Sequence, residues 1–278
     1  MQPRVLILRA PGTNCEGETA FAFERAGARA EIVHLGRLLE ASRLAGQYQV
    51  LCIPGGFSYG DDISAGRIFG TQMRQHLGET LQQFKDDGKL ILGICNGFQI
   101  LIKSGVLLPD RPDEPIATLT LNESGKFEDR WVRLRVAGPG CVFLQGIERM
   151  YLPVAHAEGK FVARDEATLE RLAESGQLVL RYAVADGRRS EVGGRKSEVG
   201  ATSDVRRPTF DSPVPYPACP NGAQLCVAGM CDETGRVFGL MPHPERHIDP
   251  TQHPRWTREH RTSGDGLAVF ENAVRFFA

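Results

Sequence analysis

The residue type most able to do chemistry in this sequence is a cysteine, Cys95, which stands inside the stretch 89–103. Apolar residues surround Gly93 just before it, as in a strand buried on both faces. Gly93 and Gly97 lie two residues to either side of Cys95, the spacing of a nucleophile elbow, where tiny neighbours allow a tight turn. The segment after the turn can start a helix, whose N-terminus favours a thiolate. We predict that Cys95 is a catalytic nucleophile; the alternative is a buried structural cysteine.

A second reactive group lies far along the chain, in the turn Pro242-His243-Pro244-Glu245. The two prolines restrict the backbone around His243, and a carboxylate two residues later can receive a ring N–H and fix the tautomer. Thiol, imidazole and carboxylate form a Cys-His-Glu triad, in which the histidine accepts the thiol proton and later protonates the leaving amine. The alternative reading of these four residues is a rigid surface turn.

Acyl transfer also requires donors for a developing oxyanion. The backbone N–H of Asn96, directly after the nucleophile, is one candidate. The Gly55-Gly56 turn is a second, because glycine lets the backbone approach a substrate closely; it can also be a plain tight turn.

The elements that must position these groups alternate between strand and helix in the first half of the chain. Such alternation is typical of βαβ units with a parallel sheet, in which sites form beyond the carboxyl ends of the strands. The Gly55-Gly56 turn and Cys95 both follow strands, so we expect them at one edge of the sheet. The strands are expected at Val5–Leu8, Ala30–His34, Tyr48–Ile53 and around Ile91, and the helices at Glu18–Ala26, Leu35–Ala45 and Gly66–Asp87.

After Gly105 the pattern changes to alternating strands with polar turns, which indicates more antiparallel pairing. A hairpin is predicted through Asp232–Gly235, and its second strand runs directly into Pro242. The expected strands are Ile116–Leu121, Trp131–Val136, Met150–Ala155, Gln177–Val184, Leu225–Cys231 and Arg236–Met241, and the expected helices are Glu166–Glu174 and Leu267–Phe277.

Composition narrows the class of protein. The chain has 278 residues, 41% of them hydrophobic and 24% charged, which is ordinary for a globular protein with a sizeable core. A net charge of −1 gives no electrostatic reason to expect nucleic acid or an anionic membrane, and no apolar run approaches the ~18 residues of a spanning helix. Seven cysteines without regular spacing indicate reduced thiols and a cytoplasmic protein. Cys219, Cys226 and Cys231 lack a C-x-x-C pair, so no metal site is expected.

One segment does not fit a packed core. Residues 186–207 contain a near-repeat with a period of seven, but each copy has a glycine and a single apolar residue, which excludes a coiled coil. We expect a single domain spanning residues 1–278 with a mobile insertion at 186–207. The alternative for this segment, a basic patch for a partner, is weakened by its interleaved acidic residues.

Together the motifs around Cys95 and His243 resemble the class I, triad-type glutamine amidotransferases. The likeness narrows to the glutaminase subunits of phosphoribosylformylglycinamidine synthase, from purine synthesis. The blocks that carry it run in family order along the chain, leaving out chiefly the 186–207 segment: Pro11–Cys15, Pro54–Asp61, Gly93–Gln99, Asn122–Glu128, Pro153–Gly159 and Met241–Arg246. The Cys and His motifs specify the class, and the blocks at 57–61 and 122–128 specify the subunit.

The resemblance implies roles for individual residues. Cys95 would form a γ-glutamyl thioester, with His243 as base and acid and Glu245 as its orienting partner. Gly56 and Asn96 would supply the oxyanion N–H groups, and Gln99, one helical turn after the nucleophile, would help hold glutamine. The implied fold is a flavodoxin-like α/β sandwich of three layers, with a mostly parallel central sheet and additional antiparallel strands in the second half.

The resemblance also implies partners. Ammonia from L-glutamine would pass to a separate synthetase subunit, which uses ATP and Mg²⁺ to convert formylglycinamide ribonucleotide to the amidine. It leaves open whether a small accessory subunit is needed. No ATP-binding loop is evident in the sequence, so we expect no cofactor in this chain. The family's usual Asn-Pro-Asn-Gly-Ser block reads Cys219-Pro220-Asn221-Gly222-Ala223 here, which puts in doubt the contacts of the lost Asn and Ser.

Two other functions compete with this one. A stand-alone cysteine hydrolase of similar fold, such as a peptidase, would act on peptides and not on glutamine. A non-catalytic subunit would keep the fold without reacting with a glutamine-mimic electrophile.

Overall fold

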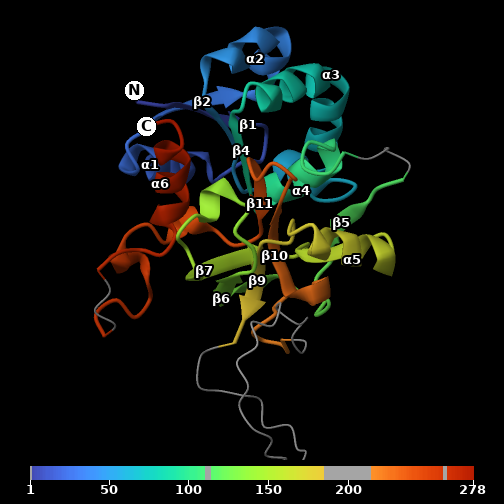
Figure 1. Ribbon diagram of the computed structural model, residues 1–278, viewed down its shortest axis with the longest axis vertical. Coiled ribbons are helices and arrows are strands. Elements are labelled where there is room, and N and C mark those ends of the chain that lie inside the picture. The colour runs from blue at the N-terminus through green and yellow to red at the C-terminus, as the bar shows by residue number, and fades with distance from the viewer. Residues whose placement is uncertain (1, 110–113, 185–213, 259–261) are drawn as a thin grey trace, which may run out of the picture.

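A single large sheet runs through the whole molecule (Figure 1). The computed structural model describes residues 2–109, 114–184, 214–258 and 262–278. The segment 186–207, for which the sequence predicts a mobile insertion, lies outside these residues. Within the sheet the strand order is β2-β1-β3-β4-β11-β10-β9-β6-β7, and β5 and β8 form a separate pair.

The strands fall close to the positions that the sequence predicts. In chain order they are β1 (Arg4–Arg9), β2 (Arg29–His34), β3 (Val50–Ile53), β4 (Leu90–Ile94), β5 (Ala117–Thr120), β6 (Glu128–Val136), β7 (Arg149–His156), β8 (Lys160–Ala163), β9 (Leu180–Ala183), β10 (Val227–Cys231) and β11 (Val237–Leu240). β8 has no counterpart in the sequence-based prediction. It is four residues long and pairs antiparallel with β5, outside the main sheet.

The first five strands of the order form a parallel sheet. β1 pairs parallel with β2 and β3, β3 with β4, and β4 with β11. This is the flavodoxin-like order 2-1-3-4-5, with β11 as the fifth strand although it is formed by residues near the other end of the sequence. All five residues of β4 are buried, as a strand covered on both faces requires. The α/β sandwich that the sequence predicts is confirmed.

The remaining strands of the main sheet are antiparallel. β11 and β10 form the predicted hairpin, and β9, β6 and β7 continue the sheet beyond it. The longest register joins β6 to β7, from the pair Glu128–His156 to the pair Arg135–Arg149. This second region therefore extends the same sheet that carries the parallel strands.

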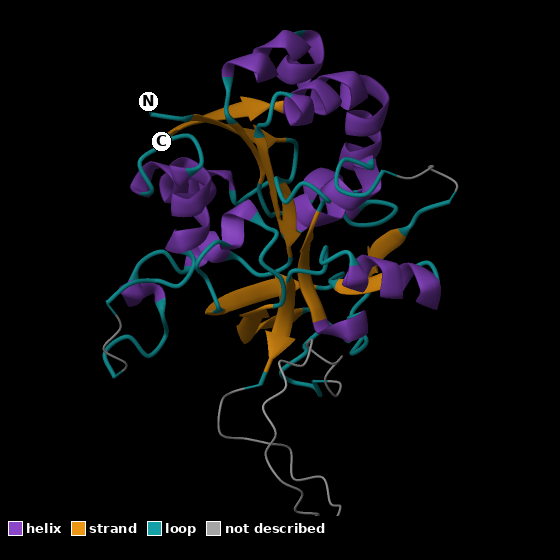
Figure 2. Cartoon of the chain, viewed as in Figure 1, coloured by secondary structure: helices purple, strands orange, loops and turns teal. Residues whose placement is uncertain are grey.

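Helices cover both sides of the parallel region, which gives the three layers (Figures 1 and 2). The α-helices are α1 (Glu16–Arg25), α2 (Leu35–Glu40), α3 (Arg67–Asp86), α4 (Asn96–Ser104), α5 (Glu166–Glu174) and α6 (Leu267–Arg275). α1 and α6 lie together on one side, where the rings of Phe23 and Phe270 meet edge to face at 4.9 Å. α3 and α4 lie on the other side. Within the described residues, none of the helices has the length and apolar character needed to cross a bilayer.

One predicted helix is interrupted. The sequence predicts a helix over Leu35–Ala45, but α2 ends at Glu40 and a 3-10 turn, Ser42–Gln47, follows it. Ala41 separates the two with φ −139° and ψ 67°, outside the helical region. Side-chain pattern alone does not reveal such a break, because apolar residues continue on both sides of it.

Candidate active site

Cys95 lies on a strained turn between β4 and α4. Its φ of +51° and ψ of −105° are rare for a residue with a side chain, and such strain is common where function requires it. A Cβ at Gly97 would come within 1.9 Å of the carbonyl oxygen of Ile53, and a Cβ at Gly93 within 2.6 Å of that of Gly97. Both flanking glycines are therefore required by close backbone contacts. This is the nucleophile elbow that the sequence predicts.

His243 lies on the turn that follows β11, the strand paired parallel with β4. Its backbone is extended, with φ −103° and ψ 91°, and its N–H donates to the carbonyl oxygen of Pro153 on β7 at 2.9 Å. Pro244 begins a single 3-10 turn, Pro244–Arg246, that carries Glu245. The parallel pair β4–β11 thus brings together two groups that are 148 residues apart in the sequence (243 − 95).

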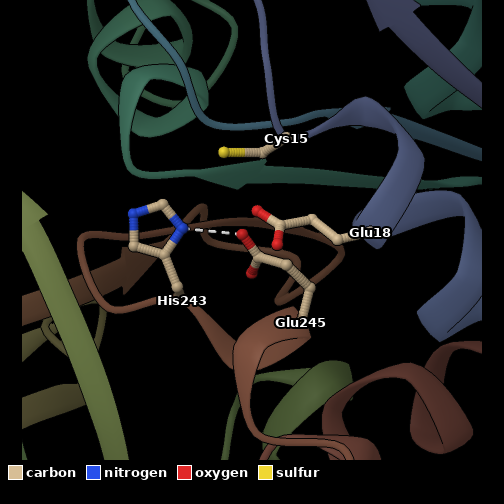
Figure 3. Close-up of side chains that lie close together, drawn as sticks. All are labelled: Cys15, Glu18, His243 and Glu245. Carbon is tan, nitrogen blue, oxygen red and sulfur yellow. Dashed lines mark hydrogen bonds and ion pairs between the residues drawn. The ribbon is translucent and has the colours of Figure 1, made fainter.

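The three residues of the predicted triad meet in the interior. The imidazole Nδ1 of His243 lies 2.6 Å from Oε1 of Glu245, and both side chains are almost completely buried (Figure 3). The Cys95 thiol approaches the carbonyl oxygen of Ala155 at 3.7 Å and lies close enough to the same ring to raise the pKa of its imidazole, although among the described residues no hydrogen bond reaches Nε2 of His243. The carboxylate engages Nδ1 and leaves Nε2 of the ring without a hydrogen-bond partner in the described part of the chain, as proton transfer through the imidazole requires.

The charge of His243 depends on these neighbours. Burial alone would lower the pKa of its imidazole, but the Glu245 carboxylate, followed by the Cys95 and Cys15 thiols, raises that pKa well above its usual value. The nearby His156 behaves in the opposite way: burial, and then the charge of His243, lower its pKa to about 3. The two imidazoles at this site therefore differ: the neighbours of His243 favour its charged form, and burial favours the uncharged form of His156.

The Gly55-Gly56 turn packs directly against the base. A Cβ at Gly55 would lie 2.8 Å from Cε1 of His243, so a side chain at this position would push the ring away. Gly56 has a φ of +142°, and a Cβ there would come within 2.8 Å of the backbone of Thr13 and Asn14. The structure thus places this turn beside the triad, where the sequence predicts an oxyanion donor.

The other two predicted site residues lie in one network of hydrogen bonds. The side chain of Asn96, the first residue of α4, accepts from the backbone N–H of Ser58 at 3.2 Å and donates to the side-chain oxygen of Gln99 at 2.9 Å. Gln99 in turn donates to the carbonyl oxygen of Glu158 at 2.5 Å. All six predicted site residues are consequently gathered around the elbow. The network holds Asn96 and Gln99 in fixed orientations next to the nucleophile.

Sequence reasoning missed three residues that surround His243. Cys15 lies after β1, and its sulfur faces the imidazole (Figure 3). Arg246 donates through Nη2 to Sγ of Cys15 at 3.2 Å and through Nε to Glu18 at 2.9 Å. Two features of the sequence could have pointed to Cys15: it belongs to the block Pro11–Cys15, and it follows a predicted parallel strand. Only the strand order β1-β3-β4-β11 shows that this position meets the base.

The altered block keeps its structural residue. Asn221 is completely buried and donates to the carbonyl oxygen of Gly159 at 2.6 Å and to the hydroxyl of Tyr182 at 3.1 Å. Cys219 and Cys226 instead line a cavity of about 800 Å³ beside Arg135 and Arg181. The triad is not among the residues that line it.

Known proteins resemble this chain over nearly its full length. A family model described as a CobB/CobQ-like glutamine amidotransferase domain matches residues 2–193 and 208–277. A phosphoribosylformylglycinamidine synthase subunit PurQ from Dehalococcoides mccartyi is 46% identical over 276 residues, which cover 98% of this chain and 97% of the relative. A protein of the same name from Methanococcus maripaludis is 38% identical over 288 residues, covering 99% and 97%.

Solved structures of glutamine amidotransferases also resemble this chain. A chain in the structure of PurLQS from Thermotoga maritima is 30% identical, covers 100% of both chains and superposes with a TM-score of 0.67. A glutamine amidotransferase from the same organism, 14% identical with a TM-score of 0.50 over 99% of this chain and 91% of that one, shares the fold. The chain therefore belongs to the glutamine amidotransferases, in the family of glutaminase subunits of phosphoribosylformylglycinamidine synthase.

Proposed function

We propose that glutamine hydrolysis, the activity of this enzyme family, is carried out by Cys95, His243 and Glu245. The observation that carries the proposal is the buried arrangement of the three groups at the ends of the paired strands β4 and β11, with Glu245 at 2.6 Å from Nδ1 and Nε2 of His243 left without a hydrogen-bond partner among the residues that the structure describes. Glu245 holds the ring in the tautomer that leaves its other nitrogen for the thiol.

The reaction has two halves. The Cys95 sulfur attacks the side-chain carboxamide carbon of L-glutamine, a C–S bond forms, and the C–N bond breaks as His243 protonates the leaving ammonia. Water then attacks the γ-glutamyl thioester, His243 takes its proton, and glutamate leaves with the thiol restored. The backbone N–H groups of Gly56 and Asn96 stabilise the oxyanion in both halves.

Gln99 helps to bind and orient glutamine and takes no part in breaking the C–N bond. Its amide is fixed by Asn96 and the carbonyl oxygen of Glu158 and lies one helical turn after Cys95. Hydrogen bonds to groups already held in place favour one orientation of glutamine at the elbow. This role predicts a change in KM more than in kcat when Gln99 is altered.

The ammonia is consumed by a synthetase. The Thermotoga maritima chain that resembles this one occurs in a structure named PurLQS. By analogy the present chain delivers ammonia to a synthetase subunit that uses ATP and Mg²⁺ to convert formylglycinamide ribonucleotide to formylglycinamidine ribonucleotide, with a small accessory subunit in the complex. The ATP and Mg²⁺ belong to that partner, and this chain itself uses no metal or other cofactor.

Two coarser features belong to the same proposal. Residues 1–278 act as one domain, because a single sheet carries both the strand before Cys95 and the strand before His243. The chain works in the cytoplasm, in keeping with seven cysteines that are all free thiols.

The decisive experiment measures glutamine hydrolysis with and without the cognate synthetase, for the unaltered chain and for Cys95→Ala. We expect weak hydrolysis alone, a clear increase with the synthetase, and loss of both in the variant. A glutamine-mimic electrophile should label Cys95, which mass spectrometry of the digested chain detects. Residual activity in Cys95→Ala, or labelling of another thiol, would overturn the assignment. Cleavage of peptides and not glutamine would favour a stand-alone hydrolase.

A further inference from the structure

A second thiol adjoins the imidazole of the triad. Cys15 is 1% exposed, and its sulfur lies with the ligand atoms of Glu18, His243 and Glu245 in a group whose members are all within 4.8 Å of one another. Figure 3 shows the sulfur facing the His243 ring from the loop that leads into α1. The thioester chemistry uses one thiol, so the presence of another at the same base requires its own explanation.

Contacts on several sides fix the orientation of Cys15. Its thiol lies 3.2 Å from the side-chain oxygen of Asn14 and accepts a hydrogen bond from Nη2 of Arg246, also at 3.2 Å. Its backbone N–H donates to the carbonyl oxygen of Gly55 at 3.3 Å. A side chain held in this way presents a fixed surface to whatever packs against it.

The loop that carries Cys15 touches both the oxyanion turn and the base. The backbone N–H of Phe57 donates to Gly12 at 2.9 Å, and that of Tyr59 donates to Pro11 at 2.7 Å. A Cβ at Gly55 would meet Sγ of Cys15 at 3.1 Å and Cε1 of His243 at 2.8 Å, so the loop, the turn and the ring are in mutual contact. A shift of the loop would therefore change the positions of the oxyanion turn and the imidazole together.

Two other uses of Cys15 are less consistent with its contacts. The four ligand atoms are of types that Zn²⁺ accepts, but the guanidinium of Arg246 already donates to both Cys15 and Glu18 and supplies positive charge there. Cys15 is also not suited to attack a substrate: burial raises the pKa of its thiol, and that effect outweighs the opposing influence of His243. A neutral thiol beside the ring packs and hydrogen-bonds without reacting.

We propose that Cys15 is a positioning residue for His243: held by Asn14 and Arg246, it forms the wall that keeps the imidazole between Cys95 and Glu245 and in register with the Gly55-Gly56 turn. This inference rests on the proposed function, in which His243 transfers the protons. Arg246 contributes by joining the triad turn to Cys15 and, through Glu18, to α1.

The test compares Cys15→Ala and Cys15→Ser in the complex with the cognate synthetase. Cys15→Ala removes the wall beside the ring, and we expect kcat for glutamine to fall about 10-fold with KM changed less than about 2-fold, since a misplaced base affects the chemical step. Cys15→Ser keeps a small hydrogen-bonding group and should recover part of the lost kcat. Cys141→Ala is the matched control, because Cys141 is an equally buried free thiol that lies near Cys231, outside the site.

A pH profile separates positioning from a general loss of stability. The charged or titratable groups around His243 are Glu245, Cys95, Cys15, Glu18, His156 and Arg246. Because Cys15 is among the groups that keep this imidazole protonated, the alkaline limb of kcat should move to lower pH in Cys15→Ala and return in Cys15→Ser. A destabilised but correctly arranged site would lower the maximal kcat without shifting the pH at which kcat falls on the alkaline side.

Each outcome decides between the claims. If Cys95→Ala stays active, the proposed function itself fails. If Cys95→Ala is inactive while Cys15→Ala keeps the kcat and pH limb of the unaltered chain, or raises KM alone, the positioning role is wrong. An equal loss in Cys141→Ala would also overturn it. Should Cys15→Ala fail to fold by circular dichroism, Glu18→Gln releases one anchor of Arg246 from the surface and should lower kcat about 2-fold with KM unchanged.

Discussion

The two halves of the active site are built in different ways. Cys95 is fixed locally: the strand before it, the helix after it and the two flanking glycines lie within residues 90–104. His243 is fixed by distant segments: its N–H is held by Pro153 on β7, and its ring is packed by Gly55 and Cys15. The comparison teaches that the elbow depends on a turn within one segment and its contact with the neighbouring strand β3, whereas the base depends on segments from across the sheet.

The sharpest way to break the local half is Gly97→Ala. The added Cβ would lie 1.9 Å from the carbonyl oxygen of Ile53, so β3 and α4 cannot keep their spacing. We expect activity to be lost and the free energy of unfolding to fall by about 3 kcal/mol or more, as severe overpacking of a core does. Urea denaturation measures the change. Gly78→Ala, on the exposed face of α3 with open space around its Cβ, is the control: activity should be unaltered and the free energy of unfolding should rise by about 0.5–1 kcal/mol, because alanine favours a helix over glycine.

The distant half is tested by Glu245→Gln, which keeps the shape but removes the charge. Burial lowers the pKa of His243, and the Glu245 carboxylate is the main group that raises it again. The imidazolium that protonates ammonia exists below that pKa, so a raised value extends activity to higher pH. We expect kcat to fall by about 10²-fold to 10⁴-fold and the alkaline limb to move to lower pH. An unmoved limb in steady-state assays would contradict this account.

Stability should respond with opposite signs in the two halves. The backbone of Cys95 on the elbow is strained, with φ +51°, whereas His243 has an ordinary extended backbone. Cys95→Gly should therefore raise the free energy of unfolding by about 1 kcal/mol, since glycine relieves that strain. His243→Gly should lower it, because a packed ring is lost. Thermal unfolding of the two inactive variants makes the comparison, and stabilisation of both would refute it.

The smallest expected effect concerns the link between the halves. The ion pair of Arg246 with Glu18 is 2.9 Å long, but both side chains are about one third exposed, at 36%. Exposed pairs contribute about 0–1 kcal/mol and weaken with salt. We expect kcat to decline by less than about 2-fold between low salt and about 0.5 M NaCl, and Glu18→Gln to abolish that dependence. A steep decline in the variant would show that salt acts elsewhere.

The same comparison explains how much could be predicted from the sequence. The elbow could be identified because its defining features are adjacent in the sequence: a reactive thiol, glycines at fixed spacing and a strand–helix junction. The alternation of strands and helices predicted the parallel sheet, and the turn Pro242–Glu245 supplied a histidine and a carboxylate that are adjacent in sequence. The family resemblance joined the two, and the parallel pair β4–β11 gives the physical reason for their meeting.

What escaped prediction depends on long-range packing. Nothing near Cys15 indicates that its sulfur will face a histidine 228 residues later (243 − 15), because that contact follows from the order of four strands. Arg246 belongs to the sequence block Met241–Arg246, but that block does not indicate its partners Cys15 and Glu18 at the start of α1. The break at Ala41 and the short strand β8 are set by local backbone geometry and by pairing outside the main sheet, which side-chain periodicity does not encode.

The position of β11 has a consequence for when the site is assembled during synthesis and folding. Among the described strands it is formed last in chain order, yet it occupies the middle of the sheet, between β4 and β10. During translation the thiol emerges from the ribosome long before its base, and the two meet only when this strand inserts at the centre. If His243 is the base, as we propose, polypeptides that lack this strand should not hydrolyse glutamine.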